Sequence, residues 1–424
     1  MLAIGLAWSD EDATGLANRY RVPGPIPISG RPGSEVAVAW NLIAYETANA
    51  HDQFFSFVGS RALAMAHVAM HDALNAITPR YEQYAFTGAE PGADPVAGAT
   101  EAAHAVLVAV YPAQRERLDR ERERWLARVP DGRSKQLGLS LGGTSAAAIL
   151  VRRQGDGHDA TGKYTPGHRP GDYQFTPGFD FAMAPEFRNA KPFGLRSPSQ
   201  FRAPPPPPLE SAEYATSFNE VKRLGAARGS ARSADQTGYA HWWAEFAEHA
   251  WNRIGRLTAP ERGLDLWDAA RMFALINMEI FDVYVASFDS KYHYHTWRPY
   301  TAIRAAAQDG NPETEPDPGW EPEMQTLPIP EYPSAHAAVG AGGAEVISHV
   351  YGTPNVSFRM QSVTALPGQE MRSYDNLDAA ADECAASRVM NGFHFRFATE
   401  AGKVQGRKVA RHLLANYLRP RRPR

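Results

Sequence analysis

The sequence has little of three features that would point at once to a particular class of protein. It contains one cysteine, Cys384, which excludes an intramolecular disulfide and a cluster of thiolate metal ligands. No uninterrupted apolar run approaches the length of about 18 residues that a membrane-spanning helix needs. The 44 Lys and Arg nearly balance the 47 Asp and Glu, and this balance argues against a general nucleic-acid-binding protein.

The composition is that of a globular protein. Hydrophobic residues make up 43% of the 424 residues and charged residues 21%, so the chain can bury a substantial core. Its first residues, MLAIGLAWSDED, are apolar but few and lack a basic flank, so they are not predicted to form a signal peptide. We expect a soluble protein, and the sequence does not decide between a secreted or periplasmic location and the cytoplasm.

The apolar residues recur mainly with a helical period, and no segment alternates for long enough to predict a strand. We therefore expect an all-α fold. The clearest helical patterns lie in 60–77, 97–128, 134–154, 236–256 and 261–290.

Two stretches rich in proline and glycine are predicted to be loops. Residues 155–209 end in the run APPPPPL, which favours a stiff polyproline spacer on the surface. Residues 309–333 hold seven prolines in 25 positions, and a loop of that length often shapes an active site. We expect an N-terminal extension at 1–34, a helical region at 35–230, and a C-terminal helical region at 231–424 that forms one compact unit with it.

Three short segments of the last third could carry chemistry. They supply three cations, a serine before a predicted helix, and two histidines. Arginine and lysine suit the binding of oxyanions, and the N-terminus of a helix adds free N–H groups. Histidine can act as a nucleophile, a metal ligand or a general acid near neutral pH. These candidates are Lys291, Arg298, Arg388, Ser334, His336 and His394.

These segments resemble the three-part signature shared by vanadium-dependent haloperoxidases and type 2 phosphatidic acid phosphatases. The chain reads KYHYHTWRP, PSAH and SRVMNGFH, where the signature reads KxxxxxxRP, PSGH and SRxxxxxH. Thirty-three residues separate Pro299 from Pro333, and 50 separate His336 from Ser387. Earlier segments such as WNLIAYET and SRALAMAHVAMHDALNAI also resemble the bacterial haloperoxidase-like branch, so the resemblance covers most of residues 36–418.

The resemblance implies an all-helical fold of paired four-helix bundles, with vanadate or phosphate bound in the C-terminal half. Lys291, Arg298 and Arg388 would hold the equatorial oxygens, Lys291 also polarising bound peroxide. Ser334 and the backbone N–H of Ala335 would add hydrogen bonds.

The two histidines would have different roles under the same resemblance. His394 would bond vanadium directly, or attack phosphorus in a phosphatase. His336 would hydrogen-bond the apical oxygen and act as acid or base. Hydrogen peroxide, a halide and a small organic substrate would be the partners of such an oxidoreductase, and a homo-oligomer is compatible with the sequence.

Two positions depart from the family pattern. Ala335 replaces the usual glycine, which is tolerable unless the position needs positive φ. Ala398 stands where the family often has an aspartate four residues after the last histidine, a carboxylate that would fix the histidine tautomer. Glu400 would have to reach back, or a backbone carbonyl would have to substitute.

Several neighbouring residues could line a halide or substrate pocket, although core packing explains each at least as well. They are Phe288, Trp297, Ile329, His293 and His295. His293 and His295 are two residues apart and cannot face one site from a regular helix, which disfavours a metal pair.

Three functions remain open. The first is a vanadium-dependent haloperoxidase, favoured by the length and the N-terminal segments. The second is an acid phosphatase with a phosphohistidine intermediate. The third is a degenerate oxyanion-binding protein, for which Ala398 is the main sequence feature.

Overall fold

The computed structural model describes residues 32–52 and 57–421. The initial segment MLAIGLAWSDED therefore lies outside the described residues. Within them the helices are α2 (Glu35–Asp52), α3 (Val58–Ile77), α4 (Pro95–Val110), α5 (Arg115–Leu126), α6 (Arg133–Arg152), α7 (Ala212–Leu224), α8 (Ala234–Trp242), α9 (Ala247–Glu261), α10 (Leu266–Tyr294), α11 (Pro299–Arg304), α12 (Ala335–Tyr351), α13 (Leu377–Met390) and α14 (Arg396–Asn416).

The expectation of an all-α fold is confirmed, with one small exception. Strands β1 (Phe358–Gln361) and β2 (Met371–Tyr374) pair in an antiparallel hairpin, where no strand was predicted. Each strand has only four residues, too few to show alternation in a sequence. The pattern at 97–128 divides into α4 and α5, because Pro112 begins a short 3₁₀ turn between them.

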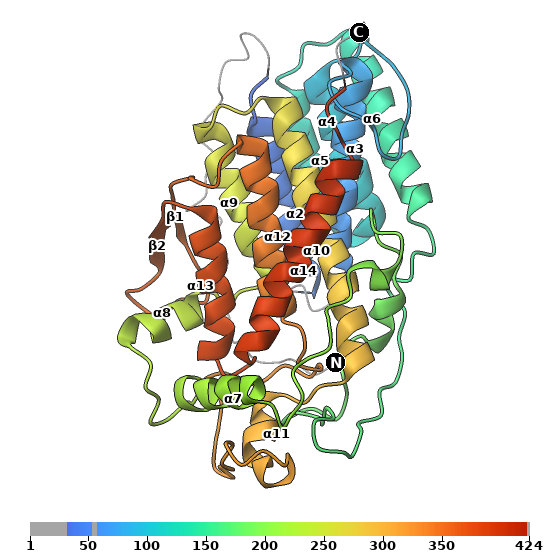
Figure 1. The fold of residues 1–424 in the computed structure, drawn as a ribbon. Coiled ribbons are helices and arrows are strands. Elements are labelled where there is room, and N and C mark those ends of the chain that lie inside the picture. The colour runs from blue at the N-terminus through green and yellow to red at the C-terminus, as the bar shows by residue number, and fades with distance from the viewer. Residues whose placement is uncertain (1–31, 53–56, 422–424) are drawn as a thin grey trace.

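Helix α10 is the centre of the molecule. It packs against α3 on one side and α12 on another, and all but a few of its 29 residues are buried. Helices α4 and α6 cover α3, whereas α14 and α13 cover α12 (Figure 1). Two groups of helices therefore share α10, and the division of the chain at residue 231 stays a prediction.

Helices α12 and α14 lie unusually close together because α14 presents glycines to its neighbour. A Cβ at Gly402 would overlap the Ser334 carbonyl, and a Cβ at Gly406 would overlap the Ala338 carbonyl. Removing the side chain lets the two backbones approach. This contact places the start of α14 directly beside the start of α12.

One carboxyl group is buried in the core without a hydrogen-bond partner. Glu279 of α10 is fully buried, and neither of its side-chain oxygens is bonded. Its carboxyl group fills the space left by Gly342 of α12. Burial, reinforced by the nearby Asp282, raises the pKa of Glu279 well above its ordinary value. Folding therefore favours the neutral form of the Glu279 carboxyl.

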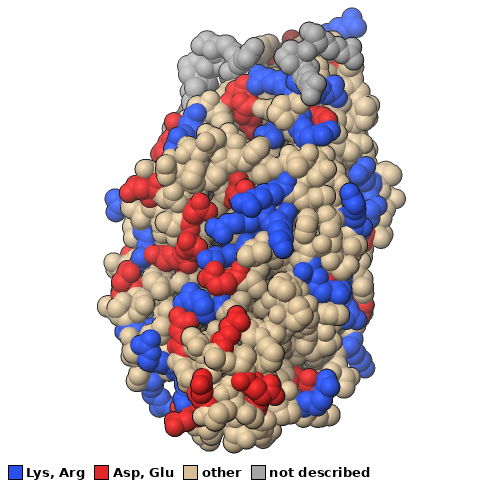
Figure 2. Space-filling model, in the orientation of Figure 1, with Lys and Arg blue, Asp and Glu red and all other residues tan. Residues whose placement is uncertain are grey.

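Unlike the carboxyl group of Glu279, many charged side chains on the surface form ion pairs. Figure 2 shows Lys and Arg gathered over α14, with acidic side chains of α13 beside them. Lys403 and Arg407 of α14 form ion pairs with Asp382 and Asp378 of α13. Among the described residues, no helix combines the length and apolarity needed to cross a bilayer.

Replacing Gly406 with alanine is predicted to lower the free energy of unfolding by about 1–3 kcal/mol, because the new methyl group forces α14 away from α12. Gly143 of α6 is the matched control, since a Cβ there meets nothing within 4 Å. Gly143→Ala should raise the free energy of unfolding by about 0.5–1 kcal/mol. Urea unfolding measures both, and equal effects would contradict the close packing of α12 and α14.

Glu279→Gln tests the neutral carboxyl. A carboxyl whose folded-state pKa is raised stabilises the fold below its unfolded pKa and loses that contribution as pH rises through the folded pKa. The stability of the variant relative to wild type should therefore increase from pH 5 to pH 8, by up to about 1.4 kcal/mol per pH unit. Glu116→Gln, at an exposed position, should show no such trend in urea unfolding, and a flat difference for Glu279→Gln would show that this carboxyl is not buried as described.

Candidate functional site

The predicted site residues come together where four helix ends meet. Lys291 lies in the last turn of α10 and Arg388 in the last turn of α13. Ser334 caps the N-terminus of α12, and His394 lies two residues before α14 begins. Helix α12 runs parallel to α14 and antiparallel to α13, so the starts of α12 and α14 and the end of α13 lie on one side of the bundle, near α7 and α11 (Figure 1).

Lys291 and Arg298 hold the end of the proline-rich loop. The Lys291 Nζ donates to the carbonyls of Pro330 and Glu331, both at 2.8 Å. Arg298 donates from Nε to the Ile329 carbonyl at 2.7 Å and from a terminal nitrogen to the Phe393 carbonyl at 2.9 Å. Both cations are 2% exposed. Burial and the neighbouring Arg298 lower the pKa of Lys291 well below its ordinary value.

Arg388 is also buried, at 4% exposure, and is held by neutral acceptors. It donates to the Ser387 hydroxyl at 3.0 Å and to the Trp243 carbonyl at 2.7 Å. Burial lowers its pKa to about 10, so it still carries its charge at neutral pH. Within the described ranges, none of Lys291, Arg298 and Arg388 forms an ion pair with a carboxylate.

The start of α12 has the predicted cap. The Ser334 hydroxyl accepts a hydrogen bond from the Ala337 N–H at 3.3 Å, and the serine is fully buried. Ala335 is the first helical residue and does not have positive φ, so the alanine in place of the family's glycine causes no backbone strain. The first N–H groups of the helix have no intrahelical acceptor and are available to an anion.

His394 is held from both sides of its ring. Its Nδ1 lies 2.8 Å from Oε1 of Glu331, and its Nε2 lies 3.2 Å from a terminal nitrogen of Arg298. Burial and then the charges of Arg298, Lys291 and Arg388 lower the pKa of His394 well below its ordinary value. The imidazole is therefore neutral while the pocket holds no anion.

The carboxylate at His394 is not the one considered from the sequence. Glu400, which the sequence analysis considered as one alternative beside a backbone carbonyl, forms an ion pair with Lys403, and Ala398 is fully buried. Glu331 supplies the carboxylate from the proline-rich loop. It is fully buried, and burial raises its pKa to about 7. Its place three residues before Ser334, as the acid of IPEYPSAH, was the available signal.

His336 presents an unused nitrogen. Its Nε2 is buried and has no hydrogen-bond partner. Burial and the neighbouring Arg388 lower the pKa of His336 well below its ordinary value. The Trp243 carbonyl holds Arg388 beside it, a contact that no sequence motif predicts.

Two of the five predicted lining residues border this cluster. Ile329 accepts from Arg298 through its carbonyl, so its backbone belongs to the site. Trp297 is buried, its indole N–H is unpaired, and its ring lies beside the Tyr214 hydroxyl.

The other three predicted lining residues contact groups outside this cluster or are exposed to solvent. Phe288 stands in an aromatic cluster with Phe57, their ring centroids 4.9 Å apart. His293 is exposed. His295 has left-handed backbone, φ 53°, and its Nδ1 lies 3.1 Å from the Tyr164 hydroxyl.

The donor set fits a tetrahedral oxyanion. Three buried cations without ion pairs, the N-terminus of α12 and the unpaired Nε2 of His336 all offer charge or hydrogen bonds to an anion. No group of His, Cys, Asp and Glu in the described part of the chain could hold a bare metal ion. The cations and hydrogen-bond donors of the cluster suit a tetrahedral oxyanion such as phosphate or vanadate.

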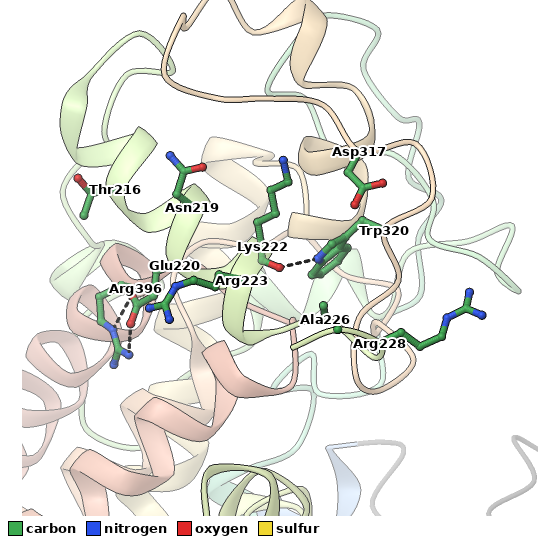
Figure 3. Close-up of a pocket in the computed structure, with 11 residues that line it drawn as sticks. Thr216, Asn219, Glu220, Lys222, Arg223, Ala226, Arg228, Asp317, Trp320 and Arg396 are labelled. Atoms are coloured by element: carbon green, nitrogen blue, oxygen red, sulfur yellow. Dashed lines mark hydrogen bonds and ion pairs between the residues drawn. The ribbon is translucent and has the colours of Figure 1, made fainter. Parts of the chain in front are cut away.

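A separate hollow of about 1000 Å³ lies on the outer side of α7 (Figure 3). Lys222, Arg223, Trp320 and Arg396 are among its lining residues, and none of the predicted site residues is. Arg396 is paired there with Glu220. The hollow is open to solvent and distinct from the buried cluster.

Comparison with known proteins agrees with this arrangement. Residues 271–422 match the family model described as the VCPO second helical-bundle domain. Vanadium chloroperoxidase of Curvularia inaequalis is 24% identical over 283 residues, which cover 51% of this chain and 46% of that protein. The chain thus spans about half the length of this curated relative.

Solved structures match over nearly the whole chain. The crystal structure of a bacterial vanadium-dependent iodoperoxidase has a TM-score of 0.78 and 25% identity, covering 93% of this chain and 98% of that one. A holo-type bacterial vanadium-dependent chloroperoxidase has a TM-score of 0.69 and 17% identity, covering 91% and 98%.

The fold is that of the helical-bundle proteins to which the vanadium haloperoxidases belong. More narrowly, residues 271–422 match a domain model of the vanadium chloroperoxidases, and the chain is similar in sequence and fold to vanadium-dependent haloperoxidases.

Binding of an oxyanion in the pocket is predicted to stabilise the fold. A ligand at 100 times its Kd adds about 2.7 kcal/mol, so orthovanadate or phosphate should raise the Tm of the wild type. Arg388→Met should abolish this rise, whereas its anion-free Tm should not fall, because a buried charge without an ion pair is removed.

Arg359→Met is the matched control, since Arg359 is exposed on β1 and should leave the Tm response intact. Differential scanning fluorimetry at constant ionic strength measures all three proteins. An equal response in wild type and Arg388→Met would place the anion elsewhere.

Proposed function

We propose that this protein is a vanadate-dependent peroxidase that oxidises a halide with hydrogen peroxide. The observation that carries the proposal is the pocket of three buried, unpaired cations around a neutral histidine. Such a concentration of charge is costly to bury unless an anion neutralises it. The vanadium haloperoxidases among the relatives support vanadate as this anion.

The residues divide the binding of vanadate among them. Lys291, Arg298 and Arg388 would hold its equatorial oxygens, and the Ser334 hydroxyl with the N–H of Ala335 would add hydrogen bonds. His394 would offer Nε2 as the ligand. Bound vanadate supplies Lewis-acid activation of hydrogen peroxide without a change of oxidation state.

His336 is placed to move a proton at this site. Its Nε2 is buried without a hydrogen-bond partner, and it would carry a lone pair when the ring proton is on Nδ1. It can therefore take a proton from hydrogen peroxide as it binds and return it later. Ala335 and His336 are also the partly exposed members of the cluster, which favours entry of peroxide and halide from their side.

A phosphatase reaction is the second candidate, and one contact favours it. Glu331 accepts from Nδ1 of His394 and leaves Nε2 as a nucleophile, as formation of phosphohistidine requires. The same contact removes the main reason for the third hypothesis, a degenerate protein, because that hypothesis depended on Ala398 lacking a carboxylate.

The first test is oxidation of iodide and bromide by hydrogen peroxide, with and without orthovanadate, followed by halogenation of a dye. Wild type should require vanadate, and His394→Ala should reduce kcat by at least about 100-fold, as expected for loss of the cofactor ligand. His349→Ala, on the far end of α12, is the matched control and should keep its activity.

Hydrolysis of p-nitrophenyl phosphate by the same preparations separates the two candidates. Vanadate-dependent halide oxidation supports the peroxidase. Phosphate release that vanadate inhibits, without halide oxidation, would replace it with the phosphatase.

A further inference from the structure

We propose that Glu331 is the positioning residue that fixes the tautomer of His394, replacing from the proline-rich loop the carboxylate that family relatives often carry four residues after this histidine. The inference rests on the proposed function for its catalytic meaning. Its structural content, the proton on Nδ1 and the lone pair on Nε2, can be tested without turnover.

Two contacts determine which ring nitrogen carries the proton. A guanidinium group can only donate, so the Arg298 nitrogen at 3.2 Å from Nε2 requires a lone pair there. The proton of the neutral ring is then on Nδ1, which donates to Oε1 of Glu331 at 2.8 Å. The two contacts come from different segments and require the same tautomer.

The carboxylate is itself held in place. Its Oε1 also accepts from the Phe395 N–H at 3.0 Å, directly after the histidine. The backbone of Glu331 donates to the Thr296 carbonyl at 2.9 Å and accepts from Lys291 at 2.8 Å. One residue thus connects the segment of Lys291 with that of His394, and it fixes the distance between two groups proposed to contact vanadate.

No other carboxylate is available for this role among the described residues. Ala398 is fully buried, and its carbonyl accepts from the Ser334 N–H at 3.0 Å. Glu400 is paired with Lys403. Glu331 is the acid in direct contact with His394, while its second oxygen, Oε2, has no partner.

The expected consequence is stronger ligation by Nε2. A carboxylate that accepts from the second nitrogen of a ligand histidine orients the ring and increases its basicity. Loss of such a partner typically costs about 10–100-fold in affinity for the bound metal. Glu331 acts through His394 and does not touch vanadate itself.

The test uses Glu331→Gln and Glu331→Met in the full chain. Glutamine keeps an oxygen for Nδ1 and for the Phe395 N–H but removes the charge, and methionine removes both. The dissociation constant for orthovanadate should rise about 10-fold or more for Gln and further for Met. Glu323→Gln is the control, because Glu323 lies in the same loop and holds Arg232 and His241. If looser loop anchoring were the cause, that control would lose affinity equally.

The tautomer is read directly by nitrogen-15 NMR of histidine-labelled, anion-free protein, with His394→Asn identifying the signals. Wild type should show a protonated Nδ1 and an unprotonated Nε2. Protonation on Nε2, or unchanged vanadate affinity in both Glu331 variants, would overturn the inference. The expected tautomer in a wild type that binds vanadate but oxidises no halide would instead overturn the proposed function and leave the role of Glu331 intact.

Discussion

Burial of three cations without ion pairs is the constraint on which the rest of the site depends. Lys291, Arg298 and Arg388 are each at most 4% exposed, and all are held by neutral oxygens. Backbone carbonyls can orient these groups but do not neutralise them. Burial and then the charges of these cations lower the pKa of His394, which favours its neutral ring. An oxyanion would complete the site electrostatically, and His394 would offer it the lone pair of Nε2.

The packing of the helices explains how so much charge can be concentrated at one place. Glycines on α14 bring its backbone against α12, so that Ser334 and His394 start neighbouring helices at the same end of the bundle. Lys291 and Arg388 lie in the last turns of α10 and α13, which reach the same end of the bundle. The proline-rich loop closes over it and contributes Glu331. Chain segments that are far apart in sequence meet because α12 and α14 begin where α10 and α13 end.

Much of this arrangement could be predicted from the sequence, and what could not has a physical reason. The helical periods and the Ser334 cap are local sequence patterns, so they could be predicted from the sequence. Glu331 acts through a contact with a residue 63 positions away, and no local pattern reports such a contact. Every residue has a backbone carbonyl, so the sequence does not indicate that the carbonyl of Trp243 contributes to the site. Glu400 has the right chemistry near His394, but its partner is a lysine three residues ahead on the same helix.

The central claim is that the buried cations and His394 hold one oxyanion. Anomalous X-ray diffraction from crystals soaked in orthovanadate tests it most directly, with data collected on both sides of the vanadium absorption edge. The account predicts a single vanadium peak within bonding distance of Nε2 of His394, surrounded by Lys291, Arg298 and Arg388. Vanadium elsewhere, for instance in the hollow beside α7, together with an empty pocket, would contradict it.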